Sequence, residues 1–301
     1  MRKLPDWVDR SLYPFTTHAL EWDGHRIHYV DQGRGPALLM LHGNPTWSFV
    51  WRDVIGRLSD RFRCIAPDLP GFGLSEAPSG FDGRPESIAE VLTGFVEELD
   101  LDNVVLVAQD WGGPIGLSIV ERMPERFAGL VLGNTWGWPV TGDRHFERFS
   151  ALMGGAVGAW LTRRANLFVN AIIPAGHKRR RPSADEMRHY RRALGTPQRR
   201  QASAIMPREI VRSAPFLARV ESGLPALRSL PVLLIWAGRD IAFREIELDR
   251  WTRELPDATV VRIPDAGHFL QSDAPTEFAD TIRAWHRDPT PDAENATEGA
   301  R

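Results

Sequence analysis

The chain is poor in cysteine and lacks any long apolar run. Cys64 is its only cysteine, so no disulfide can form within the chain. This residue stands in the apolar stretch 62–67, which predicts a buried thiol and suits a reducing compartment. No run approaches the length of a membrane span, and the start of the chain has no apolar core of signal-peptide type. We therefore expect a cytoplasmic protein that does not contact membranes.

Net charge and tyrosine are scarce as well. The formal net charge of −2 gives no electrostatic reason to expect nucleic acid or an anionic membrane as a partner, which leaves small neutral ligands. Eleven tryptophans stand against three tyrosines, a bias that bears on the chemistry below. The 43% hydrophobic and 25% charged content over 301 residues predicts a large α/β domain with room for an inserted subdomain. Oligomerisation is left open.

Short apolar runs alternate with longer helical patterns, which is typical of βαβ units that feed a mostly parallel sheet. The first two strands are joined by Asp23-Gly24 and are expected to form a hairpin. Eight strands with flanking helices at this spacing predict an α/β-hydrolase core. We expect strands at residues 18–22, 26–30, 37–41, 64–66, 104–107, 129–132, 232–235 and 259–263, and helices at 49–58, 85–99, 114–121, 245–254 and 275–286.

The alternation stops between about residues 136 and 214. This segment is rich in arginine, contains no strand-like run of length, and shows helical periodicity at 151–161 and 184–194. It predicts a helical cap inserted after the sixth strand. The core would then comprise 1–135 and 215–288, the cap 136–214, and the polar end 289–301 a disordered tail. The basic run 177–182 is interpreted as a solvated cap loop rather than a nucleic-acid patch.

Residues 104–113 have the layout of a nucleophile elbow, with Asp110 where a serine usually stands. The elbow is a buried strand, a sharp turn and a helix, and small residues flank the nucleophile so that the turn can close. Ala108 and Gly112 occupy the small positions. A carboxylate is already anionic and forms an ester by displacing a leaving group from carbon. Asp110 therefore indicates hydrolysis of an alkyl group rather than esterase chemistry.

Three further motifs follow predicted strands at the sheet edge where open α/β sheets place their sites. The loop His-Gly-Asn-Pro at 42–45 would supply the Asn44 amide to an oxyanion hole, and the amide of Trp111 would be its partner. Asp240 follows the seventh strand and His268 the eighth. Nucleophile, acid and base thus run in the chain order that this fold requires.

At this point the chain resembles the haloalkane dehalogenases, from Tyr13 through Trp285. The resembling motifs are His-Gly-Asn-Pro-Thr at 42–46, Asp-Leu-Pro-Gly-Phe-Gly-Leu-Ser at 68–75, Gln-Asp-Trp-Gly-Gly at 109–113, and the loops of Asp240 and His268. The 68–75 motif is shared widely among cap-bearing hydrolases and supports the fold more than the activity. The resemblance implies that haloalkanes are cleaved to alcohol and halide through an alkyl ester of Asp110.

The resemblance also assigns roles to individual residues. Asn44 and Trp111 would stabilise the departing halide through uncharged N–H donors. His268 would activate water, and Asp240 would support it, since Asn134 after the sixth strand cannot provide a charge. This combination is similar to the family branch with an Asp-His-Asp triad and an Asn-Trp pair. A cap tryptophan such as Trp160 is a further possible donor. No metal or cofactor is expected.

Other functions on the same scaffold are alternatives. Epoxide hydrolases share the Asp nucleophile, but they typically protonate the epoxide with two cap tyrosines, and this cap holds only Tyr190. Haloacetate dehalogenases carry an arginine after the nucleophile, where Trp111 stands here. A cofactor-free oxygenase or a ligand-binding protein is also compatible with the fold, although a pure receptor has no need of a complete triad.

Overall fold

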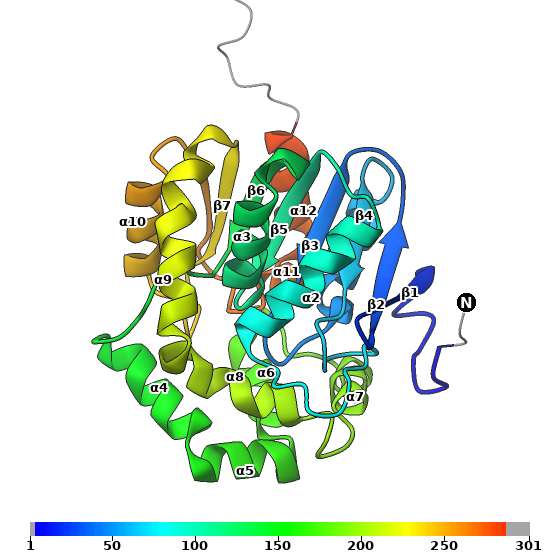
Figure 1. The fold of residues 1–301 in the computed structure, drawn as a ribbon. Coiled ribbons are helices and arrows are strands. Elements are labelled where there is room, and N and C mark those ends of the chain that lie inside the picture. The colour runs from blue at the N-terminus through cyan, green and yellow to red at the C-terminus, as the bar shows by residue number, and fades with distance from the viewer. Residues whose placement is uncertain (1–3, 287–301) are drawn as a thin grey trace, which may run out of the picture.

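The structure is a computed structural model that describes residues 4–286, and it contains one eight-stranded sheet within that range (Figure 1). Each expected strand is present, and most extend one or two residues beyond the prediction. The strands are β1 (Thr17–Trp22), β2 (His25–Gln32), β3 (Ala37–Leu41), β4 (Arg63–Pro67), β5 (Val104–Gln109), β6 (Phe127–Gly133), β7 (Val232–Ala237) and β8 (Thr259–Ile263).

The strand order is β1-β2-β4-β3-β5-β6-β7-β8. The hairpin of β1 and β2 is antiparallel, and β2 pairs antiparallel with β4. All pairings from β4 to β8 are parallel. The mostly parallel sheet expected from the sequence is confirmed, and the carboxyl ends of β3, β5, β6, β7 and β8 meet at one edge.

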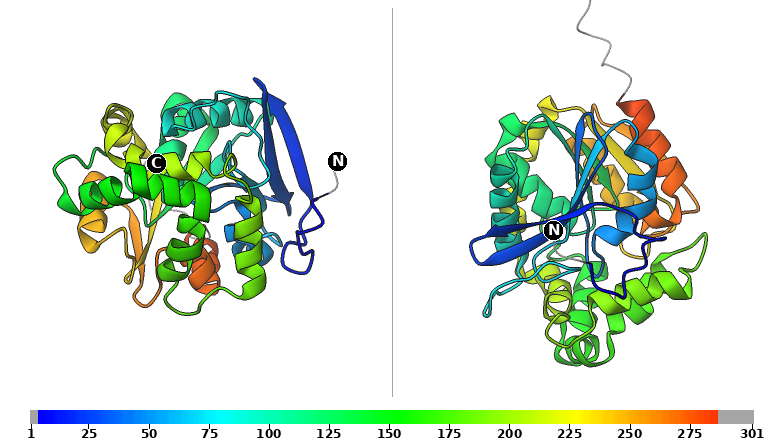
Figure 2. Two further views of the ribbon diagram at one scale, coloured as in Figure 1. Left: turned by 90° about the horizontal axis from the view of Figure 1, so that it is seen from below. Right: turned by 90° about the vertical axis from the view of Figure 1, so that its right-hand side faces the viewer.

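Helices cover both faces of the sheet, and further helices lie beyond the carboxyl ends of its strands (Figures 1 and 2). The expected helix at 49–58 is instead a 3-10 turn, η1 (Ser48–Trp51), followed by α1 (Arg52–Leu58). The other core helices are α2 (Pro85–Glu98), α3 (Gly112–Arg122), α9 (Ala214–Gly223), α10 (Glu245–Glu254), α11 (Leu270–Asp273) and α12 (Pro275–Trp285), with 3-10 turns η2 (Pro124–Arg126) and η4 (Leu224–Ser229).

Alternate side chains of the strands enter two separate hydrophobic layers. On β5, Leu106 and Ala108 belong to the layer that includes α2, α3, α9 and α10, whereas Val105 and Val107 belong to the layer that includes α1, α11 and α12. This is the two-residue period of a strand whose faces are both covered. Because both layers are apolar, β5 is buried throughout and fixes the position of the turn that follows it.

The helical segments between β6 and α9 gather beyond the carboxyl ends of the strands, at the bottom of Figure 1. They are α4 (Arg144–Gly154), α5 (Ala156–Ala165), the π-helical turn η3 (Phe168–Ile172), α6 (Ile173–Gly176), α7 (Ala184–Ala193) and α8 (Gln201–Arg212). The expected tail at 289–301 lies outside the described residues. Within residues 4–286, no helix is both long and apolar enough to cross a membrane.

Candidate active site

The turn between β5 and α3 places Asp110 in the left-handed backbone region, with φ of 53°. Few residues other than glycine adopt this region without strain, and asparagine and aspartate are among those enriched there. The Asp110 amide donates to the Asn134 carbonyl at 3.1 Å, and the Thr135 hydroxyl donates to the Asp110 carbonyl at 2.7 Å. The end of β6 therefore holds the elbow in its sharp turn.

Two glycines are required for the close approach of the loops at this turn. A Cβ atom at Gly112 would lie 2.3 Å from the Leu41 carbonyl oxygen, so the small position expected after the nucleophile admits no side chain. A Cβ atom at Gly43 would lie 2.2 Å from Oδ1 of Asp110. The backbone of the loop after β3 therefore packs directly against the Asp110 side chain. This contact brings the backbone amide of Asn44, the residue after Gly43, to the carboxylate.

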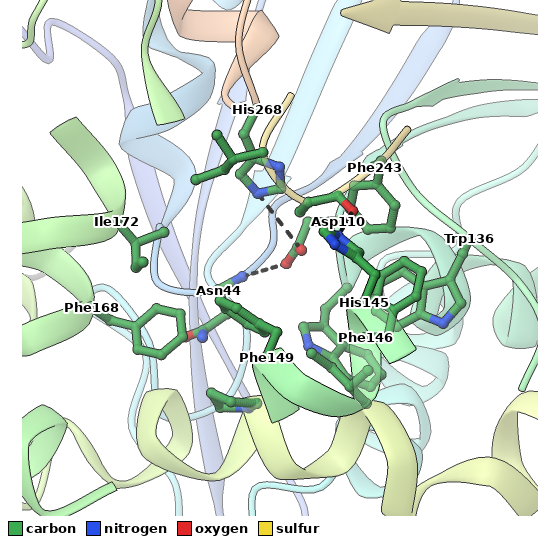
Figure 3. A pocket seen from close by; sticks show the side chains of 15 residues that line it. Asn44, Asp110, Trp136, His145, Phe146, Phe149, Phe168, Ile172, Phe243 and His268 are labelled. Atoms are coloured by element: carbon green, nitrogen blue, oxygen red, sulfur yellow. Dashed lines mark hydrogen bonds and ion pairs between the residues drawn. The ribbon is translucent and has the colours of Figure 1, made fainter. Parts of the chain in front are cut away.

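The Asp110 carboxylate is held by one of its two oxygens. Oδ1 accepts the Asn44 backbone N–H at 2.9 Å, and the Trp111 backbone N–H also donates to the carboxylate. The other oxygen, Oδ2, lies 3.8 Å from Nε2 of His268 (Figure 3). The two amides expected to form an oxyanion hole therefore already contact the group on which negative charge would develop.

His268 lies between two carboxylates, that of Asp110 after β5 and that of Asp240 after β7. Its Nδ1 is 3.0 and 3.1 Å from the two oxygens of Asp240, whose side chain is fully buried. Its Nε2 faces Asp110, and Phe243 stacks on the ring at a centroid distance of 5.9 Å. With Nδ1–H donated to Asp240, Nε2 is free to accept a proton. The three residues predicted from chain order are thus brought together.

Asn134, which the sequence only excluded as an acid, contacts Asp240 directly. Its side-chain amide donates to Oδ2 of Asp240 at 2.8 Å, and its oxygen accepts the Ala237 N–H at 2.8 Å. A second unpredicted contact comes from Gln109, whose Nε2 donates to the His268 carbonyl at 3.1 Å and lies 3.3 Å from the ring Nε2. Gln109 ends β5 beside Asp110, and Asn134 directly follows β6; these positions are the only sequence signal that marks the two residues.

Burial and charge act in opposite directions on the titrating groups. Burial raises the pKa of Asp110 above its usual value, although His268 and the amides of Trp111 and Asn44 favour the charged form. For His268 burial opposes the charged form, but the Asp240 carboxylate, its hydrogen bond and the charge of Asp110 raise the pKa above its usual 6.5. The imidazolium is therefore the better stabilised form of this histidine.

The triad opens into an apolar cavity of about 160 Å³. Asn44, Asp110, Trp111 and His268 line its inner end, and aromatic side chains form most of the remaining wall (Figure 3). A cavity of this size and lining accepts a small apolar molecule and little bulk water. The side chains that surround the catalytic end are Trp136, His145, Phe146, Phe149, Phe168, Ile172, Pro207, Ile210, Ile241, Ala242 and Phe243.

The cap contributes to this wall, but not with the tryptophan expected. Trp160 is 59% exposed and does not line the cavity, so the suggestion of a cap donor at this position is wrong. Trp136, just after β6, lines the cavity and packs edge-on against Trp111 at 4.6 Å. The Asn44 side chain reaches the cap, where its Nδ2 lies 3.4 Å from the Ser203 carbonyl. Among the described residues, the lining includes no tyrosine.

The 68–75 motif has a structural role. Asp68 is fully buried and accepts the backbone N–H groups of Ser48 at 2.8 Å and Leu74 at 2.7 Å, with His28 Nδ1 at 2.9 Å. It joins β2, η1 and the 68–75 loop and lies outside the cavity lining. No group of three or more His, Cys, Asp or Glu suited to a metal ion occurs in residues 4–286.

Comparison with known proteins gives one family and a consistent set of relatives. Residues 36–275 match the alpha/beta hydrolase fold family. The chain is 44% identical to haloalkane dehalogenase 2 of Mycobacterium tuberculosis over 91% of its length and 96% of that protein. It is also 30% identical to a cis-3-alkyl-4-alkyloxetan-2-one decarboxylase of Shewanella oneidensis, covering 91% of this chain and 89% of the relative.

A solved structure agrees with the sequence relatives. The crystal structure of a haloalkane dehalogenase loop variant from Bradyrhizobium elkanii superposes with a TM-score of 0.82 at 27% identity. The match covers 90% of this chain and 96% of that one. The sheet and the surrounding helices therefore share one architecture with that protein.

Proposed function

This chain belongs to the haloalkane dehalogenases of the alpha/beta hydrolase fold, hydrolases that act on carbon–halogen bonds, and on that premise we propose which of its residues carry the reaction. The observation that carries the proposal is the geometry of Asp110. One carboxylate oxygen accepts the Asn44 backbone amide, the other faces His268, and Asp110 lines the apolar cavity.

In the first step, Oδ2 of Asp110 attacks the halogen-bearing carbon in line with the leaving group. A carbon–oxygen bond forms, the carbon–halogen bond breaks, and the electron pair leaves with the halide. The indole N–H of Trp111 and the carboxamide of Asn44 stabilise the departing halide, since both line the cavity beside Asp110 and neither carries a charge. The product of this step is an alkyl ester of Asp110.

In the second step, Nε2 of His268 takes a proton from water, and the oxygen of that water bonds to Cγ of Asp110. The developing oxyanion is Oδ1, which already accepts the Asn44 amide, and the Trp111 amide also favours negative charge on this group. Asp240 stabilises the imidazolium. Collapse of this intermediate breaks the bond between Cγ and the alkyl oxygen, which takes the proton from His268 and leaves as the alcohol. The second proton of the water passes from the Asp110 carboxyl group to solvent, which restores the carboxylate. No step requires a metal or an organic cofactor.

The covalent step is tested by isotope transfer. In a single turnover with enzyme in excess and heavy-oxygen water, label should enter the Asp110 side chain, because water attacks Cγ. Label only in the alcohol would reject the ester intermediate. For His268→Phe we expect a halide burst followed by a trapped ester, and steady turnover at the normal rate would reject His268 as the base.

The halide pair is tested separately. Asn44→Asp places a negative charge beside the leaving group, and we expect the rate of the halide burst to fall by about 10²-fold or more. The Asn44 backbone amide is retained in this variant, so ester hydrolysis should slow less than ester formation. An unchanged burst would exclude the Asn44 side chain from halide stabilisation.

A panel of substrates separates the related chemistries. We expect halide release from small bromoalkanes, and no comparable turnover of epoxides, because no tyrosine hydroxyl lines the described cavity to protonate an alkoxide. The relatives named as oxetanone decarboxylases make a β-lactone the necessary third arm of this panel. Lactone turnover without halide release would replace the dehalogenase assignment.

We propose that residues 136–214 act together as the cap that closes the cavity. In support, Phe146, Phe149, Phe168 and Ile172 all come from this segment and all line the wall. We further propose that the enzyme works in a reducing, cytoplasmic compartment, since Cys64 is buried and free. Its ligands would be the halogenated substrate, water and halide, with no role for nucleic acid.

A further inference from the structure

Charge is unevenly divided between the cap and the rest of the chain. Residues 144–200 hold 13 Lys and Arg against 3 Asp and Glu, a net charge of +10. The remainder holds 24 basic and 36 acidic residues, a net charge of −12. The near-neutral total of −2 therefore conceals one strongly basic end. A partner of this end responds to the nearby charges rather than to the total of −2, since charges beyond about 10 Å are largely screened at moderate salt.

The same end of the molecule exposes large apolar side chains. Leu152 and Val157 are each 72% exposed, and Trp160 is 59% exposed. Val157 and Trp160 are three residues apart on α5 and so share a helix face. Leu152 lies in the last turn of α4. A Cβ atom added at Gly158 of α5 would lie only 2.3 Å from the Leu152 carbonyl oxygen, so the two helices are in close contact there. We call these three side chains the cap patch.

Arginines flank the cap patch on both helices. Arg144 and Arg148 precede Leu152 at intervals of four residues on α4, and Arg164 follows Trp160 by four residues on α5. Residues at this spacing lie on one helix face. All three arginines are exposed, and within the described part of the chain their side chains make no hydrogen bond or ion pair. The surface thus has apolar side chains at its centre and arginine side chains on both sides of them.

This surface is carried on rigid elements. Arg200 donates to the carbonyl groups of Arg163, Arg164 and Leu194 at 3.0, 3.3 and 2.7 Å, which anchors the end of α5. On α4, Phe146 and Phe149 belong to the cavity wall, which ties this helix to the rest of the molecule. Figure 1 shows α5 at the end of the molecule farthest from the sheet, and α4 and α5 face the viewer in the left view of Figure 2.

We propose that the cap patch and its flanking arginines dock on the surface of an anionic phospholipid bilayer. Trp160 is the residue type that favours the boundary between headgroups and acyl chains, and Leu152 and Val157 add apolar area beside it. Arg144, Arg148 and Arg164 would contact lipid phosphates. A second copy of the chain is a poorer partner for this face, since a two-fold contact would oppose identical arginines.

Docking itself does not depend on the proposed function, but its benefit does. Haloalkanes are apolar and concentrate in hydrocarbon, so an enzyme held at the bilayer meets a higher local concentration of substrate. The helix that carries Leu152 on its outer side carries Phe149 on the cavity wall. The proposed docking surface and the cavity wall therefore share one helix.

The proposal is tested by co-sedimentation of the full chain with vesicles. We expect binding to vesicles of phosphatidylcholine and phosphatidylglycerol in equal parts, weakening as salt is raised, and much weaker binding to pure phosphatidylcholine. Trp160→Ala should lower the partition coefficient at least five-fold. Arg148→Gln and Arg164→Gln should each lower it by about five-fold, which corresponds to about 1 kcal/mol per basic residue near an anionic surface.

Matched controls come from outside residues 136–214. Ile246 on α10 is an apolar side chain with 56% exposure, and Arg122 on α3 is an exposed arginine. Ile246→Ala and Arg122→Gln should leave binding unchanged. Turnover of a water-soluble bromoalkane should be the same in all five variants, which separates a failure of docking from a failure of the proposed function.

Three outcomes would overturn the proposal. One is equal binding to charged and uncharged vesicles, and another is binding that Trp160→Ala leaves intact. The third is self-association of the wild-type chain, seen by light scattering, that Trp160→Ala abolishes while neither protein binds vesicles. That last result would assign the cap patch to contacts between copies of this chain.

Discussion

The side-chain amide of Asn134 donates to Oδ2 of Asp240 at 2.8 Å and thereby sets the direction in which this carboxylate faces His268. An asparagine that follows β6 thus orients the carboxylate that follows β7. The Asn134 oxygen accepts the Ala237 N–H, which fixes the amide orientation. The orientation of the catalytic acid depends on two strand ends at once.

Asn134→Ala should lower kcat by roughly ten-fold, since a hydrogen bond to a charged group contributes about 1.5 kcal/mol. KM should change little, because Asn134 does not line the cavity. Steady-state kinetics on a bromoalkane measures both constants, with the exposed Asn170→Ala as control. A higher KM with unchanged kcat would contradict this role.

The pH dependence should differ between the two chemical steps. Only neutral His268 can accept a proton, and its pKa lies above 6.5, so ester hydrolysis should slow as pH falls through that raised value. Formation of the ester does not need the base, so the halide burst should persist at the same pH. Rapid-quench measurements across pH separate the two rates.

Asp240→Asn removes the charge that raises the pKa of His268. The acid limb of ester hydrolysis should therefore move to lower pH, and kcat should fall by about 10⁴-fold, as when the corresponding acid is replaced in a serine protease triad. If ester hydrolysis in the variant slows at the same pH as in the wild type, Asp240 does not control the pKa of His268.

A buried ion-pair network joins the cap to the core. Glu186 on α7 contacts Arg52 on α1, whose side chain is 4% exposed, and pairs with Arg180 through both oxygens at 2.7 Å. Burial opposes the charge of Glu186, but Arg180 and Arg52 lower its pKa from 4.5 to about 2. Its stabilising effect is therefore complete above about 4.5 and is lost as pH falls toward 2.

Glu186→Gln should reduce the free energy of unfolding at neutral pH by about 2–4 kcal/mol, since Arg52 would lose a buried partner. The deficit should shrink on acidification. Urea denaturation at several pH values measures it, with the exposed Glu245→Gln expected to cost less than about 1 kcal/mol. A deficit that is constant with pH would argue against the ion pair.

Asp273 ties the histidine loop to the cap. Its carboxylate accepts the backbone N–H groups of Gly267 at 2.8 Å, Lys178 at 2.9 Å and Arg179 at 3.0 Å. In Asp273→Asn, the side-chain NH2 group would face backbone N–H groups that need an acceptor. We therefore expect a loss of about 2–3 kcal/mol in unfolding free energy together with a lower kcat. Asp280→Asn, an exposed change on α12, is the control. Wild-type stability with unchanged kcat would contradict the prediction.

The sheet and the triad could be predicted from the sequence because each rests on local signals. A buried parallel strand is a continuous apolar run, as at 104–107, and catalytic residues follow such strands in a fixed order. Asp110, Asp240 and His268 were located in this way. The sequence could not reveal that Asn134 binds Asp240, because the contact joins positions 106 residues apart.

The cap was predicted as helical, but its helices were only partly located. Pro207 lies inside α8, where an interior proline usually ends a helix, and this hid the pattern. The π-helical turn Phe168–Ile172 departs from the usual 3.6-residue period. Which aromatic side chains face the cavity depends on how these helices pack, so Phe149 and Phe168 were not identified and Trp160 was placed wrongly.

Two parts of the chain form the cavity wall: the loops at the strand ends and the segment 136–214. Asn44, Asp110, Trp111 and His268 come from loops at strand ends, whereas Phe146, Phe149, Phe168 and Ile172 come from the cap. Mutations in the second group can alter the shape offered to a substrate without moving a reacting atom. Substitutions in the second group are therefore expected to change which haloalkanes fit the cavity and to leave in place the groups proposed for the chemical steps.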